Sequence, residues 1–170
     1  MIVTTENKQT TISKKISLTG VGLHTGKNVT LTFVPSISDS GYVFKRIDLE
    51  NSPTIQADIK YVSSTDRGTC LNKNGLVIQT CEHVLAALVG SEIDNVIIEL
   101  NESEPPIMDG SAKFFVDALE KAGVKELDSN RKEFIVKKVI SFKDEASGSE
   151  IMVLPSKNYK VTAMVDFGTK

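Results

Sequence analysis

The amino-acid sequence predicts an α+β fold in which an antiparallel sheet is covered on one face by two helices. Apolar and polar residues alternate through most of the first 80 residues, two later segments repeat apolar residues at helical spacing, and alternation returns after residue 131. The apolar face of a sheet must be buried against another layer, which the helices would provide. We therefore expect a first α+β domain at residues 1–128 and the initial strands of an incomplete second domain at residues 129–170.

Four alternating segments in the first part of the chain are expected to form strands, because Gly, Pro, Ser and Asp residues occupy the gaps between them. Their inward-facing residues are Ile12, Ile16 and Leu18, then Val29, Leu31 and Phe33, then Tyr42 and Phe44, and finally Ile55, Ala57, Ile59 and Tyr61. The dipeptide Asn74-Gly75 lies between two further short strands, residues 69–71 and 76–78. It predicts a hairpin turn with positive φ at both central residues, although the neighbouring Asn72 and Lys73 leave a longer loop open.

Two helices are predicted from apolar residues at helical spacing. The first begins at Thr80, the expected N-cap, and ends at Gly90, whereas the second covers residues 111–122 and stops at Gly123. The residues expected to face the core are Val84, Leu85, Leu88 and Val89 in the first helix and Phe114, Phe115, Ala118 and Leu119 in the second. Between the helices, residues 94–100 alternate as a strand.

The last part of the chain is expected to contain strands only. Residues 134–142, 150–154 and 159–167 alternate, and short polar segments separate them, as in a meander. Three strands without a covering helix bury too little apolar surface for an independent domain. We therefore expect the chain to be part of a longer protein.

Composition excludes several classes of function. The chain has 20 basic and 22 acidic residues, a net charge of -2, and no basic stripe, so a nucleic-acid partner is not expected. No stretch approaches the roughly 20 apolar residues of a membrane span, and no signal-peptide core is present near the N-terminus. We expect a cytoplasmic protein that is not an integral membrane protein. The sequence does not indicate an oligomeric state.

The two cysteines, Cys70 and Cys81, are too few for a disulfide scaffold and are expected to be free thiols. Cys81 is expected to pack as a small apolar residue. A zinc site of Cys70, Cys81 and His83 is disfavoured, because the sequence lacks paired C-x-x-C spacing and a fourth ligand.

The dipeptide Glu82-His83 is the strongest chemical feature, because it places a proton-transfer group and a metal ligand in the first turn of the first predicted helix. The helix dipole favours an anion there, so Glu82 tends to stay ionised and able to accept a proton. The same field favours the neutral, metal-binding form of His83. The residues alone leave an alternative open, in which Glu82 stabilises the helix end and His83 is structural.

Three further residues are candidates for roles at a site. His24 lies in a glycine-rich loop, residues 19–26, that does not match a dinucleotide-binding motif but allows backbone to approach a ligand closely, unless it is simply a surface turn. Thr65 lies in a polar segment that either lines a cleft or is solvated. Asp109 follows a diproline and either caps the second helix or is a buried acceptor that orients a site residue.

Three segments in this order resemble one family, the zinc-dependent UDP-3-O-acyl-N-acetylglucosamine deacetylases, which perform the committed step of lipid A synthesis in Gram-negative bacteria. The segments are residues 19–31, residues 80–85 with residues 93–95, and residues 106–112. The resemblance extends over essentially the whole chain. It implies a two-domain enzyme, each domain a two-layer sandwich of the ribosomal S5 domain 2-like type, with the active site between the domains.

The resemblance also implies roles for the site residues. His83 matches the first Zn²⁺ ligand and Glu82 matches the general base, which would take a proton from the zinc-activated water that attacks the acetamide of UDP-3-O-(3-hydroxyacyl)-N-acetylglucosamine and releases acetate. His24, Thr65 and Asp109 are expected to bind substrate or support the site. The family draws its other zinc ligands, a His and an Asp, and a further acidic His from sequence beyond this chain. We therefore expect the 170-residue chain to be a fragment that is inactive alone.

Two other classes remain open from the residues. In a non-catalytic α+β binding module, Glu82 and His83 would only finish a helix and the glycine loop would contact a partner. A structural or assembly domain would expose a large apolar patch, as an unfinished second sheet also would. The reading frame beyond Lys170 separates these classes, because a downstream His-x-x-x-Asp and a later His would favour the enzyme.

Overall fold

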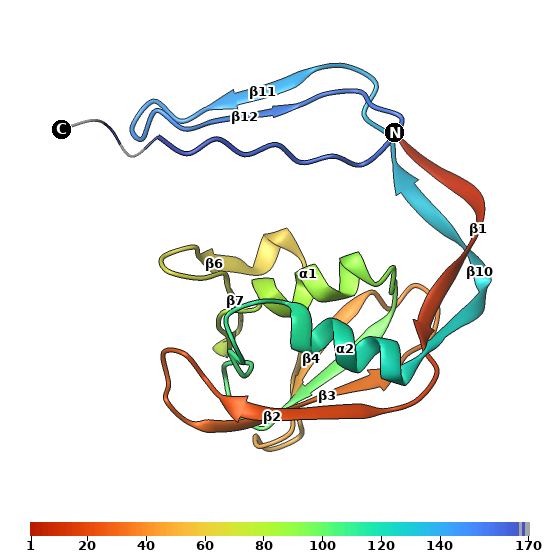
Figure 1. Ribbon diagram of the computed structural model, residues 1–170, viewed down its shortest axis with the longest axis vertical. Helices are drawn as coiled ribbons and strands as arrows, with labels where there is room; N and C mark the ends of the chain where they lie inside the picture. Colours follow the sequence, from red (N-terminus) through yellow and green to blue (C-terminus); the bar gives the residue numbers. More distant parts are fainter. Residues whose placement is uncertain (167, 169–170) are drawn as a thin grey trace. The chain divides into compact units, whose positions relative to one another are not determined.

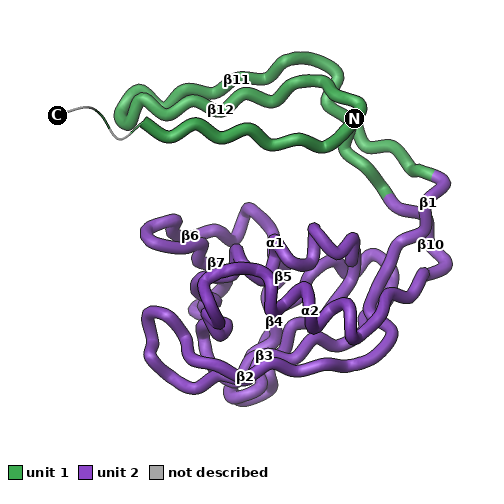
Figure 2. Tube along the Cα trace, in the orientation of Figure 1, with its two compact units in different colours: residues 1–5, 132–170 green, residues 6–131 purple. Residues whose placement is uncertain are grey.

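The structure is a computed structural model that describes residues 1–166 and 168. It divides into two compact units, which Figure 2 colours separately. The larger unit is Glu6–Arg131, and the smaller unit consists of Met1–Thr5 and the described residues from Lys132 onward. The predicted α+β class is confirmed, since α-helices and several antiparallel strand pairs occur in the same chain.

A five-stranded sheet forms one layer of the larger unit (Figure 1). Its strands lie in the order β2 (Ile16–Val21), β3 (Asn28–Pro35), β9 (Val96–Leu100), β4 (Tyr42–Arg46) and β5 (Thr54–Gln56). Neighbouring strands are antiparallel except β9 and β4, which are parallel. A parallel pair needs a long connection, and the chain forms a second sheet and a helix before β9 enters the centre of the first sheet.

The second sheet contains the predicted hairpin. Its three strands are β6 (Val62–Ser64), β7 (Cys70–Lys73) and β8 (Leu76–Ile78), in this order. Lys73 pairs with Leu76, so the loop consists of Asn74 and Gly75, whose φ angles are 53° and 86°. The prediction is confirmed in its two-residue form.

The last of the four predicted alternating strands is wrong beyond its first residues. Ile55 is buried in β5, but Ile59–Tyr61 forms a short 3₁₀ helix, η1, in which Ile59 is 88% exposed. The carboxylate of Asp58 accepts a hydrogen bond from the Lys60 amide at 3.0 Å. This local bond stabilises a turn where the apolar alternation predicted a strand.

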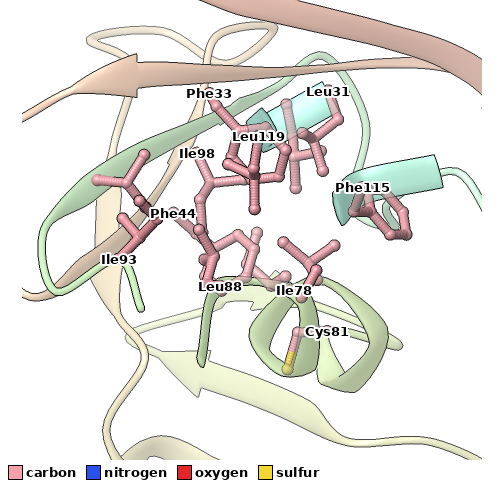
Figure 3. Close-up of a cluster of buried hydrophobic side chains, with 14 of the residues drawn as sticks. Leu31, Phe33, Phe44, Ile78, Cys81, Leu88, Ile93, Ile98, Phe115 and Leu119 are labelled. Atoms are coloured by element: carbon pink, nitrogen blue, oxygen red, sulfur yellow. The ribbon is translucent and has the colours of Figure 1, made fainter. Parts of the chain in front are cut away.

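Two helices, α1 (Glu82–Gly90) and α2 (Lys113–Ala122), form the other layer and cover one face of the five-stranded sheet (Figure 1). Their buried residues recur three and four positions apart and are Val84, Ala87 and Leu88 in α1 and Phe115, Ala118, Leu119 and Ala122 in α2. Figure 3 shows side chains of both helices meeting Phe33 and Phe44 of the sheet. The core therefore lies between the two layers.

Two residues predicted to face the core do not. Val89 is 56% exposed and Phe114 is 41% exposed. Each lies next to a fully buried residue, Leu88 and Phe115 respectively, and one step along a helix turns a side chain by about 100°. Both helices contain more apolar residues than one face can bury. The prediction was therefore wrong for the apolar residue at the edge of the buried face of each helix. The end of α2 at Gly123, with φ 72°, is confirmed.

A long strand pair was not predicted. β1 (Ile2–Ile12) and β10 (Val124–Phe134) form a two-stranded sheet. Hydrogen bonds between distant segments hold it, including two from the Lys8 ammonium, to the Asp128 carbonyl and the Asn130 side chain, each 2.8 Å long. Residues 124–134 are mostly polar, so the apolar pattern has little signal for a strand there.

The smaller unit contains one hairpin, β11 (Ile140–Lys143) and β12 (Glu150–Val153), within its described residues. The predicted strand 150–154 is confirmed, whereas the predicted strand 134–142 is interrupted at residues 135–139. Residues 159–166 are not strand, and Phe167 lies outside the described residues. Side chains of the hairpin are exposed, among them Phe142, Ile151 and Met152.

The helices of the larger unit are short. α1 has nine residues and α2 has ten. In the part of the chain that the structure describes, no helix reaches the length and apolar character needed to cross a bilayer.

Candidate functional site

Glu82 and His83 lie in the first turn of α1, as the sequence predicts. Their side chains are 39% and 31% exposed, and the Glu82 Oε1 atom lies 4.0 Å from the His83 Nε2 atom. The backbone amide of Thr69 donates a hydrogen bond of 2.8 Å to the other carboxylate oxygen, Oε2. One oxygen of Glu82 is therefore anchored, and the other faces the imidazole.

The turn that leads into α1 differs from the prediction. Cys81, not Thr80, is the N-cap residue, and the Thr80 hydroxyl donates a hydrogen bond of 2.8 Å to the Glu104 carboxylate. Thr80 is buried and has a φ of 50°, a left-handed conformation that costs a β-branched residue about 1–3 kcal/mol. The left-handed turn explains why the predicted cap is wrong, because the hydroxyl bonds to a distant segment instead of the helix.

Glu104 is a fully buried residue that the sequence analysis did not single out. It accepts hydrogen bonds from the amides of His24 and Thr25 as well as from Thr80. Burial raises the pKa of this carboxyl, but the hydrogen bonds from Thr25, Thr80 and His24 outweigh burial and hold the pKa below its usual value. The glycine loop is the sequence feature that makes room for this carboxylate, since a Cβ on Gly22 would lie 2.7 Å from Glu104 Oε2.

His24 lies in the glycine loop, and its ring is exposed. Its Nε2 atom lies 3.3 Å from the Arg67 carbonyl oxygen. His24 and Thr80 line a pocket of about 140 Å³ together with Asp66, Arg67, Gly68, Cys70 and Gln79. Gly68 adjoins Glu82, since a Cβ there would lie 3.4 Å from Glu82 Oε1. The structure therefore brings the His24 loop to the same end of the domain as the Glu82-His83 pair.

Thr65 and Asp109 have different surroundings. Thr65 is exposed in the loop after β6, one residue before the pocket-lining Asp66. Asp109 is also exposed, which excludes the alternative of a buried acceptor and leaves the alternative of a role at the start of the second helix. Its Oδ1 atom accepts hydrogen bonds from the Ser111 amide and hydroxyl, and the Ser111 hydroxyl accepts one from the first amide of α2. Asp109 therefore supports the start of α2 through Ser111, although Ala112 is the N-cap residue.

Cys81 packs in the core, as expected, and its thiol donates to the Thr69 carbonyl oxygen at 3.3 Å. Burial, reinforced by the nearby Glu82 carboxylate, raises its pKa to about 12. At pH 8 only about one Cys81 thiol in ten thousand would be ionised, and the thiolate is the reactive form.

We expect a disulfide reagent such as Ellman's reagent to modify one thiol per native chain at pH 8 and two in denaturant. The reactive native thiol is Cys70, which is partly exposed. A Cys70→Ser variant is the control and should show almost no native reaction. Equal reaction rates of both cysteines in the native chain would contradict the buried state of Cys81.

The side chains near Glu82 offer one ligand for a metal ion, the imidazole of His83. His83 presents a partly exposed imidazole, which is a common zinc ligand, and a carboxylate lies beside it. Among the described residues, no group of three His, Cys, Asp or Glu side chains is arranged to hold a metal ion. A tightly held ion would need further ligands from outside these residues.

The fold and the site together describe an α+β domain with a carboxylate and an imidazole side by side, which is an arrangement typical of enzymes that move protons. A family model described as UDP-3-O-acyl N-acetylglycosamine deacetylase, LpxC, matches residues 9–170. The chain therefore belongs to this deacetylase family.

Curated relatives support the same family. A bifunctional enzyme LpxC/FabZ from Bacteroides thetaiotaomicron is 44% identical over 160 residues, which is 94% of this chain and 35% of the relative. UDP-3-O-acyl-N-acetylglucosamine deacetylases from Geotalea uraniireducens and Blochmanniella floridana are each 41% identical over 94% of this chain, which covers 51% and 54% of their lengths. The chain thus spans about a third to a half of these relatives.

Proposed function

We propose that the protein containing this chain hydrolyses the N-acetyl group of UDP-3-O-(3-hydroxyacyl)-N-acetylglucosamine, releasing acetate, in lipid A biosynthesis. The family match supports this proposal. The observation that carries it is the Glu82-His83 pair, whose carboxylate has one anchored oxygen and one oxygen 4.0 Å from the imidazole. Deacetylation needs a proton acceptor and a group that activates the carbonyl or the water. A carboxylate such as Glu82 supplies the proton acceptor, and an imidazole such as His83 helps to hold a metal ion that is the activating group.

In this proposal Glu82 is the general base. The Thr69 amide holds Oε2 and thereby orients the carboxylate, so Oε1 accepts the proton of the attacking water. The water oxygen bonds to the acetamide carbon, the C–N bond breaks, and the amine nitrogen takes up a proton as acetate leaves. His24, Thr65 and Asp109 would bind the substrate or support the site, and of these three residues His24 lines the pocket together with Thr80.

His83 would hold a zinc ion, which when bound would polarise the carbonyl and make water more acidic. The other ligands would come from other parts of the full-length protein, since the described residues offer a single imidazole beside Glu82. On this basis we propose that the 170-residue chain alone is inactive. A cytoplasmic location, a UDP-sugar acyl substrate and the division at residue 128 stay predictions.

The test compares the full-length protein with the isolated chain. We expect the full-length protein to release acetate from the UDP-sugar substrate, to lose this activity after treatment with a zinc chelator, and to regain it with Zn²⁺. The isolated chain should retain less than one zinc per molecule and release no acetate above background.

Three different results would contradict separate parts of the proposal. Stoichiometric zinc and acetate release in the isolated chain would refute the need for further ligands. Full activity after metal removal would refute the zinc requirement. A full-length protein that binds the UDP-sugar but releases no acetate would instead favour a binding module.

A further inference from the structure

The buried carboxylate of Glu104 joins the two segments that surround the candidate site. Its Oε2 atom accepts from the amides of His24 at 3.0 Å and Thr25 at 2.9 Å, on the glycine loop. Its Oε1 atom accepts from the Thr80 hydroxyl at 2.8 Å, directly before α1. The three bonds therefore link segments that are far apart in the sequence.

The partners of Glu104 are suited to an ionised carboxylate. Each partner donates an N–H or O–H group, and a carboxylate is the side chain that only accepts. Gly22 leaves room for this arrangement, because a side chain there would collide with both Glu104 and Thr25. A glutamine at position 104 would fill the same space but would point an NH₂ group at donors. The cluster thus depends on the charge state of Glu104 and not only on its size.

Each segment held by Glu104 leads directly to a candidate residue. The left-handed turn at Thr80 sends Cys81 into the core, and α1 then starts with Glu82 and His83. The Cys81 amide donates to the Thr69 carbonyl, while the Thr69 amide donates to Glu82. The start of α1 and the anchor of the Glu82 carboxylate are therefore parts of one hydrogen-bonded unit.

The other segment presents His24. The Gly22 amide donates to the Lys27 carbonyl and the Gly26 amide to the Gly22 carbonyl, so the loop closes on itself. Glu104 bonds to the amides at the middle of this closed loop, which places the His24 ring beside the pocket wall that Thr80 also forms. Loss of the carboxylate would release the loop and the turn together.

We propose that Glu104 is a positioning residue that fixes the Glu82-His83 pair relative to the His24 loop, a role that rests on the deacetylase function proposed above. Its carboxylate acts through Thr80 and the loop amides and does not touch the reacting atoms. It sets the orientation of the base, so its loss should affect turnover more than substrate affinity.

The first test measures kinetics in the full-length protein. Glu104→Gln and Thr80→Val, which removes only the hydroxyl bond, should each lower kcat by about 10- to 100-fold with little change in KM. Thr80→Ser keeps a hydroxyl and should retain most of the turnover. Wild-type kcat in folded Glu104→Gln and Thr80→Val proteins would overturn the proposal, whatever their melting temperatures.

Glu102→Gln is the matched control. Glu102 lies two residues from Glu104 and pairs with Lys27 at 3.0 Å, but the Lys27 side chain is 61% exposed. An exposed ion pair contributes little. The control should therefore keep wild-type kcat. An equal loss of kcat in the control and in Glu104→Gln would show a general effect of the loop and overturn a specific role for Glu104.

Hydrogen–deuterium exchange separates this proposal from the proposed function. In Glu104→Gln, the amides of His24 and Thr25 should exchange about tenfold faster or more, while the amides of β9 stay protected. This result would support the positioning role even if the wild-type protein released no acetate. The absence of acetate release would refute the deacetylase function but not the positioning role. Unchanged protection at His24 and Thr25, or faster exchange throughout the chain, would overturn the positioning role in an active enzyme.

Discussion

Glu82→Gln is expected to lower the kcat of the full-length protein by about 10²- to 10⁴-fold, the range that a general base contributes. The amide has nearly the same shape, and its oxygen can still accept the hydrogen bond from the Thr69 amide that is 2.8 Å long in the structure. It cannot take a proton from water. The loss should therefore appear in kcat, with zinc content close to that of the wild-type protein.

His83→Ala provides the contrasting result. This variant removes the imidazole but leaves the carboxylate, so zinc retained after dialysis should fall, and activity should recover partly at high Zn²⁺. Metal analysis and acetate release together distinguish the two roles. Glu120→Gln, an exposed residue of α2, is the matched control and should change neither quantity. Wild-type zinc content and turnover in both site variants would overturn the role assignment.

Phe115→Ala is expected to lower the free energy of unfolding of the chain by about 3–5 kcal/mol. Phe115 is fully buried between α2 and the sheet, and Figure 3 shows its ring in the core cluster. Removing a buried ring loses its transfer free energy and leaves a cavity that the neighbouring side chains fill only in part. Denaturant unfolding followed by circular dichroism measures this change, since the chain has no tryptophan.

Phe114→Ala is the matched control on the same helix. Phe114 is 41% exposed and its ring lies 5.9 Å from the Lys113 ammonium, a contact of small energy at the surface. We expect a change of less than about 1 kcal/mol, because alanine also favours the helix. Equal destabilisation by the two substitutions would contradict the orientation of α2 and favour the sequence prediction that both rings face inward.

The comparison of these two phenylalanines shows where periodicity succeeds and where it fails. The pattern located α2 within two residues and identified Phe115, Ala118 and Leu119 as core residues. It included Phe114 because helical spacing tolerates two adjacent apolar positions on one stripe. The width of the buried stripe depends on how the helix packs on its neighbours, which the residues of the helix alone do not specify.

The candidate site divides in a similar way. The sequence placed Glu82 and His83 in the first turn of a helix, and the structure agrees. Their roles in catalysis stay predictions. The cap at Thr80 was predicted wrongly, because it was judged from neighbours along the chain, whereas of the two alternatives for Asp109 the one at the start of α2 agrees with the structure. The role of Glu104 was not predicted for the same reason, since its hydrogen-bond partners lie 24, 79 and 80 residues away in the sequence.

The sequence by itself determined the features that depend on near neighbours: strands β2, β3, β4 and β9, the Asn74-Gly75 hairpin, the two helices and the position of Glu82-His83 in the first turn. Apolar periodicity and turn residues act over a few neighbouring residues, so these strands, turns and helices can be predicted from the sequence. Only the tertiary structure decided the β1–β10 pair, the left-handed turn at Thr80 and the burial of Glu104. Each of these depends on hydrogen bonds between distant segments, and a polar residue is stable in the interior only when such partners reach it.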